Sequence, residues 1–260
     1  MPALHKSAIV ASRLCYMKMS MQRLLAITAH PDDESGSLGG TLALYARRGV
    51  AVEVVCATRG EAGRHRGQAR TVAELAELRV QEFHRACELL GIGRGDIWDY
   101  PDKGVNQATF TDLGARLCRV IREVRPDIVL SMGLEGGLTG HPDHAAITHF
   151  ATFAFHAAGR SDLYPECGPR HQARKLYHAT APFVSPVHPE VCLSPVDAEI
   201  DISETLELKI AAFECHSTQA PLFERVRNAV KRLGPREYFH LAASMVPRFH
   251  GVERDLFAGL

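Results

Sequence analysis

The sequence predicts a single α/β domain with a Rossmann-like, mostly parallel sheet and helices on both faces. Short apolar runs alternate with segments of helical periodicity as far as Gly159, and polar clusters directly follow the predicted strands. In addition, 46% of the 260 residues are hydrophobic, which suffices for one large core. Ligands of such folds bind beyond the carboxyl ends of the strands, so we expect the active site there.

The first part of the chain alternates strand and helix. The apolar run 24–29 is typical of a buried parallel strand, and a helix over 38–48 follows it and stops at Gly49. We then expect a strand at 51–58, a helix at 72–90 that stops at Gly91, a strand at 96–100, a helix at 112–125, a strand at 127–131 and a helix that begins near Pro142.

The pattern loosens in the second part of the chain. Strands are expected at 175–180 and 197–202, and an amphipathic helix at 204–215. No repeat, low-complexity tract or linker justifies a second domain, so residues 23–260 are predicted to form one. Residues 1–22 are expected to be a disordered or artefactual extension, because Met19 or Met21 could start translation directly before the first strand.

Charge and cysteine content exclude several classes of protein. Lys and Arg total 30 against 30 Asp and Glu, so the zero net charge disfavours nucleic-acid and membrane-surface binding. No apolar run approaches the roughly 20 residues that span a bilayer. The 7 cysteines are scattered and mostly lie in apolar runs, as expected of free buried thiols in a reducing, cytoplasmic compartment. The expected partner is therefore a small molecule.

Two His-Pro-Asp clusters stand out among the 14 histidines, one after the first strand and one after the fourth. Catalytic zinc typically takes three His and carboxylate ligands and leaves a position for water. His30 and Asp33 lie on one tight loop, and His144 can approach from the neighbouring strand end. Asp32 would then lie beside the metal, where an activated water needs a proton acceptor.

Each cluster alone has a simpler interpretation, since Asp32 or Asp33 could merely cap the helix that follows. Two such clusters at the ends of two parallel strands favour the metal site. His141 lies three residues before His144, so on the first helical turn it shares a face with that ligand. If it is cationic, it would add a positive group where an oxyanion forms. Glu34 is expected beside the ligands or at the helix start.

These motifs, Ala29-His30-Pro31-Asp32-Asp33-Glu34 and Gly140-His141-Pro142-Asp143-His144, resemble the LmbE-like or PIG-L family of zinc-dependent N-deacetylases. The family includes deacetylases of bacillithiol and mycothiol biosynthesis, and the match continues at 57–63, 78–79, 100–102 and 212–219. The resemblance implies one Zn²⁺ held by His30, Asp33 and His144, with Asp32 as general base. It implies that His141 stabilises or protonates the tetrahedral centre.

The resemblance also implies a substrate and its binding residues. Substrate contacts are expected from four residues in the matched segments: Arg79, Asp102, Glu61 and His216. The expected reaction releases acetate and a free amine from an N-acetylglucosaminyl conjugate, with a bacillithiol-type precursor ahead of mycothiol-type and chito-oligosaccharide substrates. The family often forms trimers or hexamers, so a homo-oligomer is compatible with the resemblance.

Several alternatives remain open. The arginines after the second strand could bind an acidic aglycone, or they could form a solvated basic loop. They are Arg59, Arg64, Arg66, Arg70 and Arg79. A nucleotide-binding oxidoreductase is disfavoured, because the first strand lacks the Gly-x-Gly-x-x-Gly that would cradle phosphates. A non-catalytic sugar-binding protein on the same fold is the remaining rival.

Overall fold

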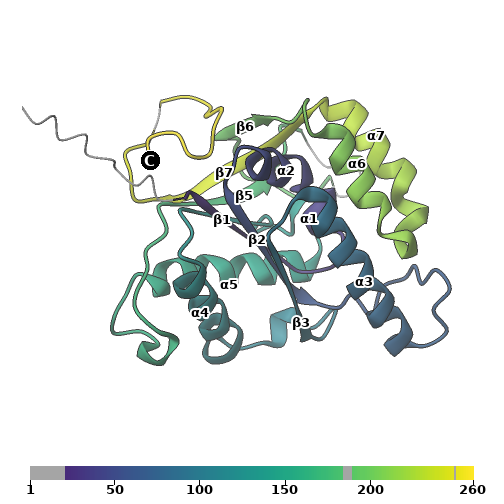
Figure 1. Cartoon of the computed structure of the whole chain (residues 1–260), viewed down its shortest axis with the longest axis horizontal. Coiled ribbons are helices and arrows are strands. Elements are labelled where there is room, and N and C mark those ends of the chain that lie inside the picture. Colours follow the sequence, from purple (N-terminus) through teal and green to yellow (C-terminus); the bar gives the residue numbers. More distant parts are fainter. Residues whose placement is uncertain (1–20, 184–188, 249) are drawn as a thin grey trace, which may run out of the picture.

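The computed structural model describes residues 21–183, 189–248 and 250–260 of the chain (Figure 1). Its sheet has seven strands in the order β3-β2-β1-β4-β5-β7-β6. Strands β1 to β5 run parallel, and β7 is antiparallel to both β5 and β6, which confirms the mostly parallel α/β fold. The strands are β1 (Arg23–Thr28), β2 (Ala51–Thr58), β3 (Arg94–Tyr100), β4 (Ile128–Ser131), β5 (Lys175–Thr180), β6 (Ala198–Asp201) and β7 (Arg236–Ser244). The predicted extension lies outside the described residues except for its last two.

Helices cover both faces of this sheet, as predicted (Figure 1). Leu42, Phe83 and Ala212 bring α2, α3 and α6 into one buried apolar cluster, while Leu117 and Phe155 bring α4 and α5 into a second. The helices are α1 (Asp33–Gly36), α2 (Gly39–Arg47), α3 (Val72–Leu90), α4 (Ala115–Val124), α5 (Pro142–Ala158), α6 (Leu206–Glu214) and α7 (Phe223–Leu233). None of the helices in the described part of the chain is long and apolar enough to cross a membrane.

Local signals explain the most regular of these elements. Helix α3 has the predicted bounds because Thr71 and Glu74 form a reciprocal capping box at its start. Gly91 ends it in a left-handed conformation with φ 74°, which glycine adopts without steric penalty. Strand β1 is buried along its length except at Arg23, as expected of a central parallel strand.

Apart from shifts of one or two residues at the ends of elements, four helices and strands differ from the sequence predictions, and the first is the short helix α1, which was not predicted. The helix expected over 112–125 begins as a π turn at Phe110–Gly114 and continues as α4. Helix α7 and strand β7 were not predicted. Strand β7 alternates buried and more exposed side chains in most of its length, because only one face of this antiparallel strand meets the core.

The arrangement of strands determines where a site can form. Strand β1 lies between β2 and β4, and the strand order reverses there. Strands β2 and β3 lie on one side of β1, and β4, β5, β7 and β6 lie on the other. Crevices at such a reversal of strand order are the usual ligand sites of doubly wound folds. The loops after β1 and β4, which carry the two His-Pro-Asp clusters, meet at this point.

Candidate active site

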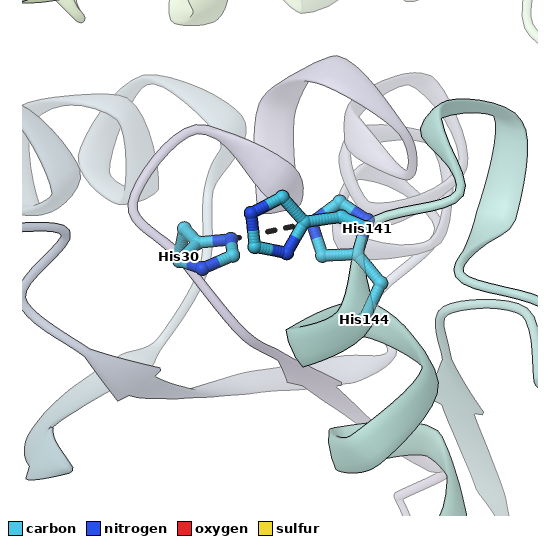
Figure 2. A group of neighbouring side chains, drawn as sticks. All are labelled: His30, His141 and His144. Atoms are coloured by element: carbon cyan, nitrogen blue, oxygen red, sulfur yellow. Dashed lines mark hydrogen bonds between the residues drawn. The ribbon is translucent and has the colours of Figure 1, made fainter. Parts of the chain in front are cut away.

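His30, two residues after the end of β1, faces His144 on the first turn of α5 (Figure 2). Nδ1 of His30 lies 3.2 Å from Nε2 of His144. The other nitrogen of each ring has oxygen acceptors: Nε2 of His30 is 3.2 Å from both Asp102 and Asp143, and Nδ1 of His144 is 3.3 Å from the Gly136 carbonyl. Burial opposes protonation, but Asp102 and Asp143 raise the pKa of His30 to about 10, so the two facing nitrogens share either a proton or a metal ion.

The Asp33 carboxylate contacts both of these rings. Its Oδ1 lies 3.1 Å from Nε2 of His144, and its Oδ2 lies 3.7 Å from Nδ1 of His30 while accepting the backbone N–H groups of Ala29 and His30. Burial opposes ionisation, but His144 and His30 hold the pKa of the Asp33 carboxyl well below its usual range. Ligands bound tetrahedrally to zinc at about 2.0–2.1 Å lie roughly 3.3 Å apart, and Nε2 of His144 lies near this distance from both Nδ1 of His30 and Oδ1 of Asp33.

His141 competes for the same position. His30, His141 and His144 offer donor atoms within 4.8 Å of one another, and so do His30, Asp102 and Asp143. His141 caps α5, and its Nδ1 accepts the backbone N–H of Asp143 at 3.1 Å. Burial and the neighbouring His30 and His144 lower the pKa of His141. The ring is therefore neutral, and with Nδ1 acting as an acceptor its proton lies on Nε2, which is free to donate a hydrogen bond.

Asp102 and Glu61 lie behind His30. Oδ1 of Asp102 contacts Nε2 of His30, and its Oδ2 accepts the backbone N–H of Ala62 at 3.0 Å. The Glu61 carboxylate in turn accepts the backbone N–H of Asp102 at 2.9 Å. A carboxylate in this position fixes the orientation and tautomer of a ligating imidazole. Asp102 also lines the cleft above the centre, whereas Glu61 is absent from the lining. The substrate contacts expected of these two residues stay predictions.

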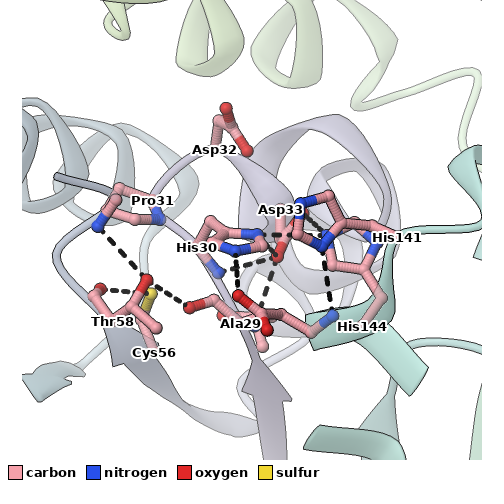
Figure 3. Close-up of polar contacts among 12 residues, drawn as sticks. Ala29, His30, Pro31, Asp32, Asp33, Cys56, Thr58, His141 and His144 are labelled. Carbon is pink, nitrogen blue, oxygen red and sulfur yellow. Dashed lines mark hydrogen bonds and ion pairs between the residues drawn. The ribbon is translucent and has the colours of Figure 1, made fainter. Parts of the chain in front are cut away.

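Asp32 occupies the cap position of α1 in a left-handed conformation with φ 116°, yet its side chain makes no capping hydrogen bond. This geometry rules out the simpler interpretation of Asp32 as a helix cap. Figure 3 shows its carboxylate on the side of the loop away from the sheet, and the residue lines the cleft. Burial raises the pKa of Asp32 to about 6 against the opposing charge of Arg79, which suits a proton acceptor near neutral pH.

Arg79 lies beneath the Asp32 loop, where it is 4% exposed. Its Nη2 contacts Oδ2 of Asp32 at 2.9 Å and donates to the Pro31 carbonyl, while Nη1 donates to the Gly60 carbonyl at 2.9 Å. Gly60 has φ 67°, and a Cβ there would lie 2.2 Å from Nη1. The arginine that we expected to bind substrate thus holds the proposed base, and the glycine of the 57–63 motif makes room for it.

Glu34 and His216 hold the same loop from the other side. Oε2 of Glu34 accepts the backbone N–H of Asp32 at 2.9 Å, and its Oε1 lies 2.7 Å from Nε2 of His216. Burial opposes protonation, but Glu34 raises the pKa of His216, so the two form a buried ion pair. Both residues are 0% exposed, which leaves His216 no surface for a substrate in this conformation.

A cleft of about 870 Å³ opens above the histidines and Asp32. Its far wall comes from α6, the turn 217–222 and α7, and it is largely apolar through Phe213, Leu222, Val226 and Val230. The arginines that line the cleft are Arg64, Arg79, Arg225 and Arg232. Of the five arginines singled out after the second strand, Arg59, Arg66 and Arg70 are absent from this lining.

The fold and these side chains define an α/β protein with a candidate metal centre beside a positioned carboxylate base. More narrowly, the chain belongs to the PIG-L family: the family described as GlcNAc-PI de-N-acetylase matches residues 25–155. A 1D-myo-inositol 2-acetamido-2-deoxy-α-D-glucopyranoside deacetylase of Rhodococcus jostii is 32% identical over 293 residues, covering 93% of this chain and 99% of that protein. The deacetylase of the same name from Thermobifida fusca is 31% identical, covering 92% and 100%.

Solved structures agree with the fold. The 4-carboxy-2-hydroxymuconate hydratase GalB of Pseudomonas putida has a TM-score of 0.73 at 26% identity, covering 89% of this chain and 100% of that one. The N,N′-diacetylchitobiose deacetylase of Pyrococcus horikoshii has a TM-score of 0.71 at 21% identity, covering 85% and 84%. The sequence relatives are named for an inositol conjugate, so the comparisons do not support the preferred bacillithiol-type substrate and fit the mycothiol-type alternative instead.

Proposed function

We infer that the protein is a zinc-dependent N-deacetylase that hydrolyses the acetamide of an N-acetylglucosaminyl conjugate. The observation that carries this proposal is the convergence of two imidazole nitrogens and an ionised carboxylate beside a separate, cleft-facing Asp32. His30, Asp33 and His144 would hold the ion. Bound there, zinc would act as a Lewis acid on the amide and bring the pKa of water near 7.

The chain's own residues supply the proton transfers. Asp32 accepts a proton from the attacking water, and its carboxylate is held in place by Arg79. The water oxygen bonds to the carbonyl carbon, the C–N bond breaks, and the proton goes to the leaving amine, which yields acetate and a free amine. His141 donates a hydrogen bond from Nε2 to the reacting group, because its Nδ1 is committed to the cap of α5.

We propose an inositol-linked N-acetylglucosamine as the substrate. Two facts support it: the names of the relatives at 31–32% identity, and a cleft whose size of about 870 Å³ accommodates more than one sugar-sized ring. These alignments cover 92–93% of this chain and 99–100% of the relatives. The similarity that supports the substrate therefore includes the wall of the cleft as well as the centre.

A hydratase is a second candidate. GalB matches over its whole chain with a TM-score of 0.73, and Arg64, Arg225 and Arg232 have no ion pair within the described ranges although they line the cleft. Such arginines suit a polycarboxylate. The same base and metal centre could direct water to a C=C bond instead of an amide.

One experiment separates these functions. Protein stripped with a chelator and reloaded with one equivalent of zinc is given inositol-linked, malate-linked and chitobiose N-acetylglucosamine, and primary amine and acetate are measured. The hydratase substrate of GalB is assayed in parallel by its absorbance. We expect amine release that is fastest for the inositol conjugate and requires zinc. Hydration without amine release would replace the deacetylase by the second candidate, and sugar binding without either reaction would indicate a binding protein.

The variant Asp32→Asn tests whether Asp32 is the general base of the deacetylase reaction. It should retain zinc and lose on the order of 10² to 10⁴ in kcat, the usual contribution of a positioned general base. Asp162→Asn, at an exposed position outside the cleft, is the matched control. Undiminished acetate release by Asp32→Asn would contradict the assignment of the base.

A further inference from the structure

A second, smaller cavity of about 90 Å³ adjoins the cleft beside His144. The two spaces share His144, Thr139 and Lys209 in their linings. The small cavity continues between the end of β4 and the end of β5, where its walls include Met132, Ala179 and Thr180. A group held at the histidine centre can therefore extend in two directions, into a space of about 870 Å³ or into one of about 90 Å³.

Lys209 is a buried cation at the junction of the two spaces. It projects from α6, is 6% exposed, and its Nζ lies 2.5 Å from Oε1 of Glu237. No second partner of Nζ is found among the described residues, so two of its three N–H donors are available. The proposed mechanism makes no use of this lysine.

The Glu237 carboxylate accepts hydrogen bonds from backbone groups as well as from Lys209. Its Oε1 also accepts the backbone N–H of Gly40 at 3.0 Å, and its Oε2 accepts that of Thr41 at 2.8 Å. These donors belong to the first turn of α2, whose dipole favours a carboxylate there. The Lys209 ammonium is thus only partly neutralised by its ion-pair partner and retains attraction for a second anion.

We propose that the small cavity receives the acyl group of the substrate and that Lys209 contacts the carboxylate of the short-chain product. This inference rests on the proposed function. The two arms of the scissile amide differ greatly in size, and only the larger space accommodates the sugar conjugate. Hydrolysis converts the acyl arm into an anion, and Lys209 is the buried cation that borders the space where this anion forms.

The size of the cavity also predicts a selection by acyl length. Met132, 2% exposed and directly after β4, is the largest flexible side chain among the apolar walls. An acetyl group adds one methyl carbon beyond the carbonyl, whereas a butyryl group adds three. We expect the rate to fall steadily from N-acetyl through N-propionyl to N-butyryl conjugates, because longer chains meet Met132.

Direct binding of acetate tests the role of Lys209 without any turnover. Zinc-loaded protein is titrated with ¹³C-acetate by NMR, with zinc content and Tm recorded for each variant. Lys209→Gln should weaken acetate binding by about tenfold to a hundredfold, the value of a charge-assisted hydrogen bond. Lys209→Arg should restore much of it, and Lys231→Gln, on the exposed side of α7, should bind like the wild type. Equal affinity in Lys209→Gln and the wild type would overturn the anion contact.

An acyl-length series tests the cavity. The ratio of kcat/KM for N-acetyl and N-butyryl conjugates is measured in the wild type and in Met132→Ala, and this ratio is insensitive to the fraction of folded protein. Met132→Ala should shift it toward butyryl by tenfold or more. An unchanged ratio would overturn the acyl pocket while leaving the deacetylase intact. If no conjugate releases amine, the proposed function fails, and the acetate titration alone decides whether Lys209 binds a short carboxylate.

Discussion

Nη2 of Arg79 lies 2.9 Å from Oδ2 of Asp32, so a buried guanidinium holds the carboxylate that we propose as the base. The same guanidinium bonds the carbonyls of Pro31 and Gly60, which join the loops after β1 and β2. The loop of Asp32 has an unfavourable backbone angle, φ 116°, that such contacts must stabilise. The position of the proposed base therefore depends on the contacts of Arg79 with Asp32 and with the carbonyls of Pro31 and Gly60.

Replacement of Gly60 tests this network. Gly60→Ala combines a left-handed backbone with a clash against Arg79, whereas Gly49→Ala has a similar angle, φ 82°, and open space around the new methyl group. Gly49→Ala should lower the free energy of unfolding by about 1–2 kcal/mol and leave kcat unchanged. Gly60→Ala should lower it further and also reduce kcat. Equal effects of the two variants, measured by denaturant titration and steady-state kinetics, would show that Arg79 does not hold the base.

His216 provides a second test, because two roles for it predict different kinetics. As a positioning residue for Glu34, it should be replaceable by Gln, which can still donate to that carboxylate. His216→Ala should lower kcat tenfold or more through displacement of Asp32, with KM and zinc content little changed. A rise in KM at constant kcat would instead support the substrate contact that the sequence suggested.

Zinc content distinguishes Asp33 from His141 as the third ligand. Asp33→Asn and His144→Ala should be purified with little zinc, whereas His141→Ala should retain it and lose rate. Asp102→Asn, which removes the carboxylate behind His30, should weaken zinc binding by about 10–100-fold. Elemental analysis after dialysis against a metal buffer gives these values. Loss of zinc from His141→Ala alone would assign the centre to His30, His141 and His144.

Stability should depend on pH through His178, which is 0% exposed on β5 and has one hydrogen-bond partner among the described residues, Thr152. Burial lowers the pKa of His178 to about 4. The unfolded chain takes up this proton near pH 6.5 and the folded chain does not, so the free energy of unfolding falls between pH 6.5 and about 4. The loss is at most about 3 kcal/mol. His178→Gln should flatten this slope in denaturant titrations, and His84→Gln, at an exposed position, should retain it.

Local patterns in the sequence were sufficient for most of the fold. The bounds of α3 follow from a capping box and a terminal glycine, and the apolar runs of β1, β2 and β5 coincide with the observed strands. Strand β7 and helix α7 were missed because their side chains are mostly half-buried or exposed, which weakens the apolar signal. Antiparallel pairing of β7 with β5 depends on contacts between residues 58 to 69 positions apart, and no local pattern encodes them.

The candidate site was predictable only where its residues share a motif. His30, Asp32 and Asp33 are adjacent in sequence, and His141 and His144 share one helical turn. The Glu34 to His216 contact joins residues 182 positions apart, and Arg79 reaches Asp32 across 47. The family resemblance suggested substrate contacts for both Arg79 and His216. Their burial beneath the Asp32 loop results from tertiary packing, which the spacing of residues in the sequence does not reveal.

The cleft takes its reactive groups and its far wall from different parts of the chain. Every residue that we assign to metal or proton transfer lies within 25–155, whereas α6, the turn 217–222 and α7 belong to the later part. Exchange of residues 220–233 between family members, which keeps Lys209 and His216 in place, would therefore change the recognition surface and leave the chemistry unaltered. A scaffold divided in this way can acquire new substrates through changes in one contiguous segment.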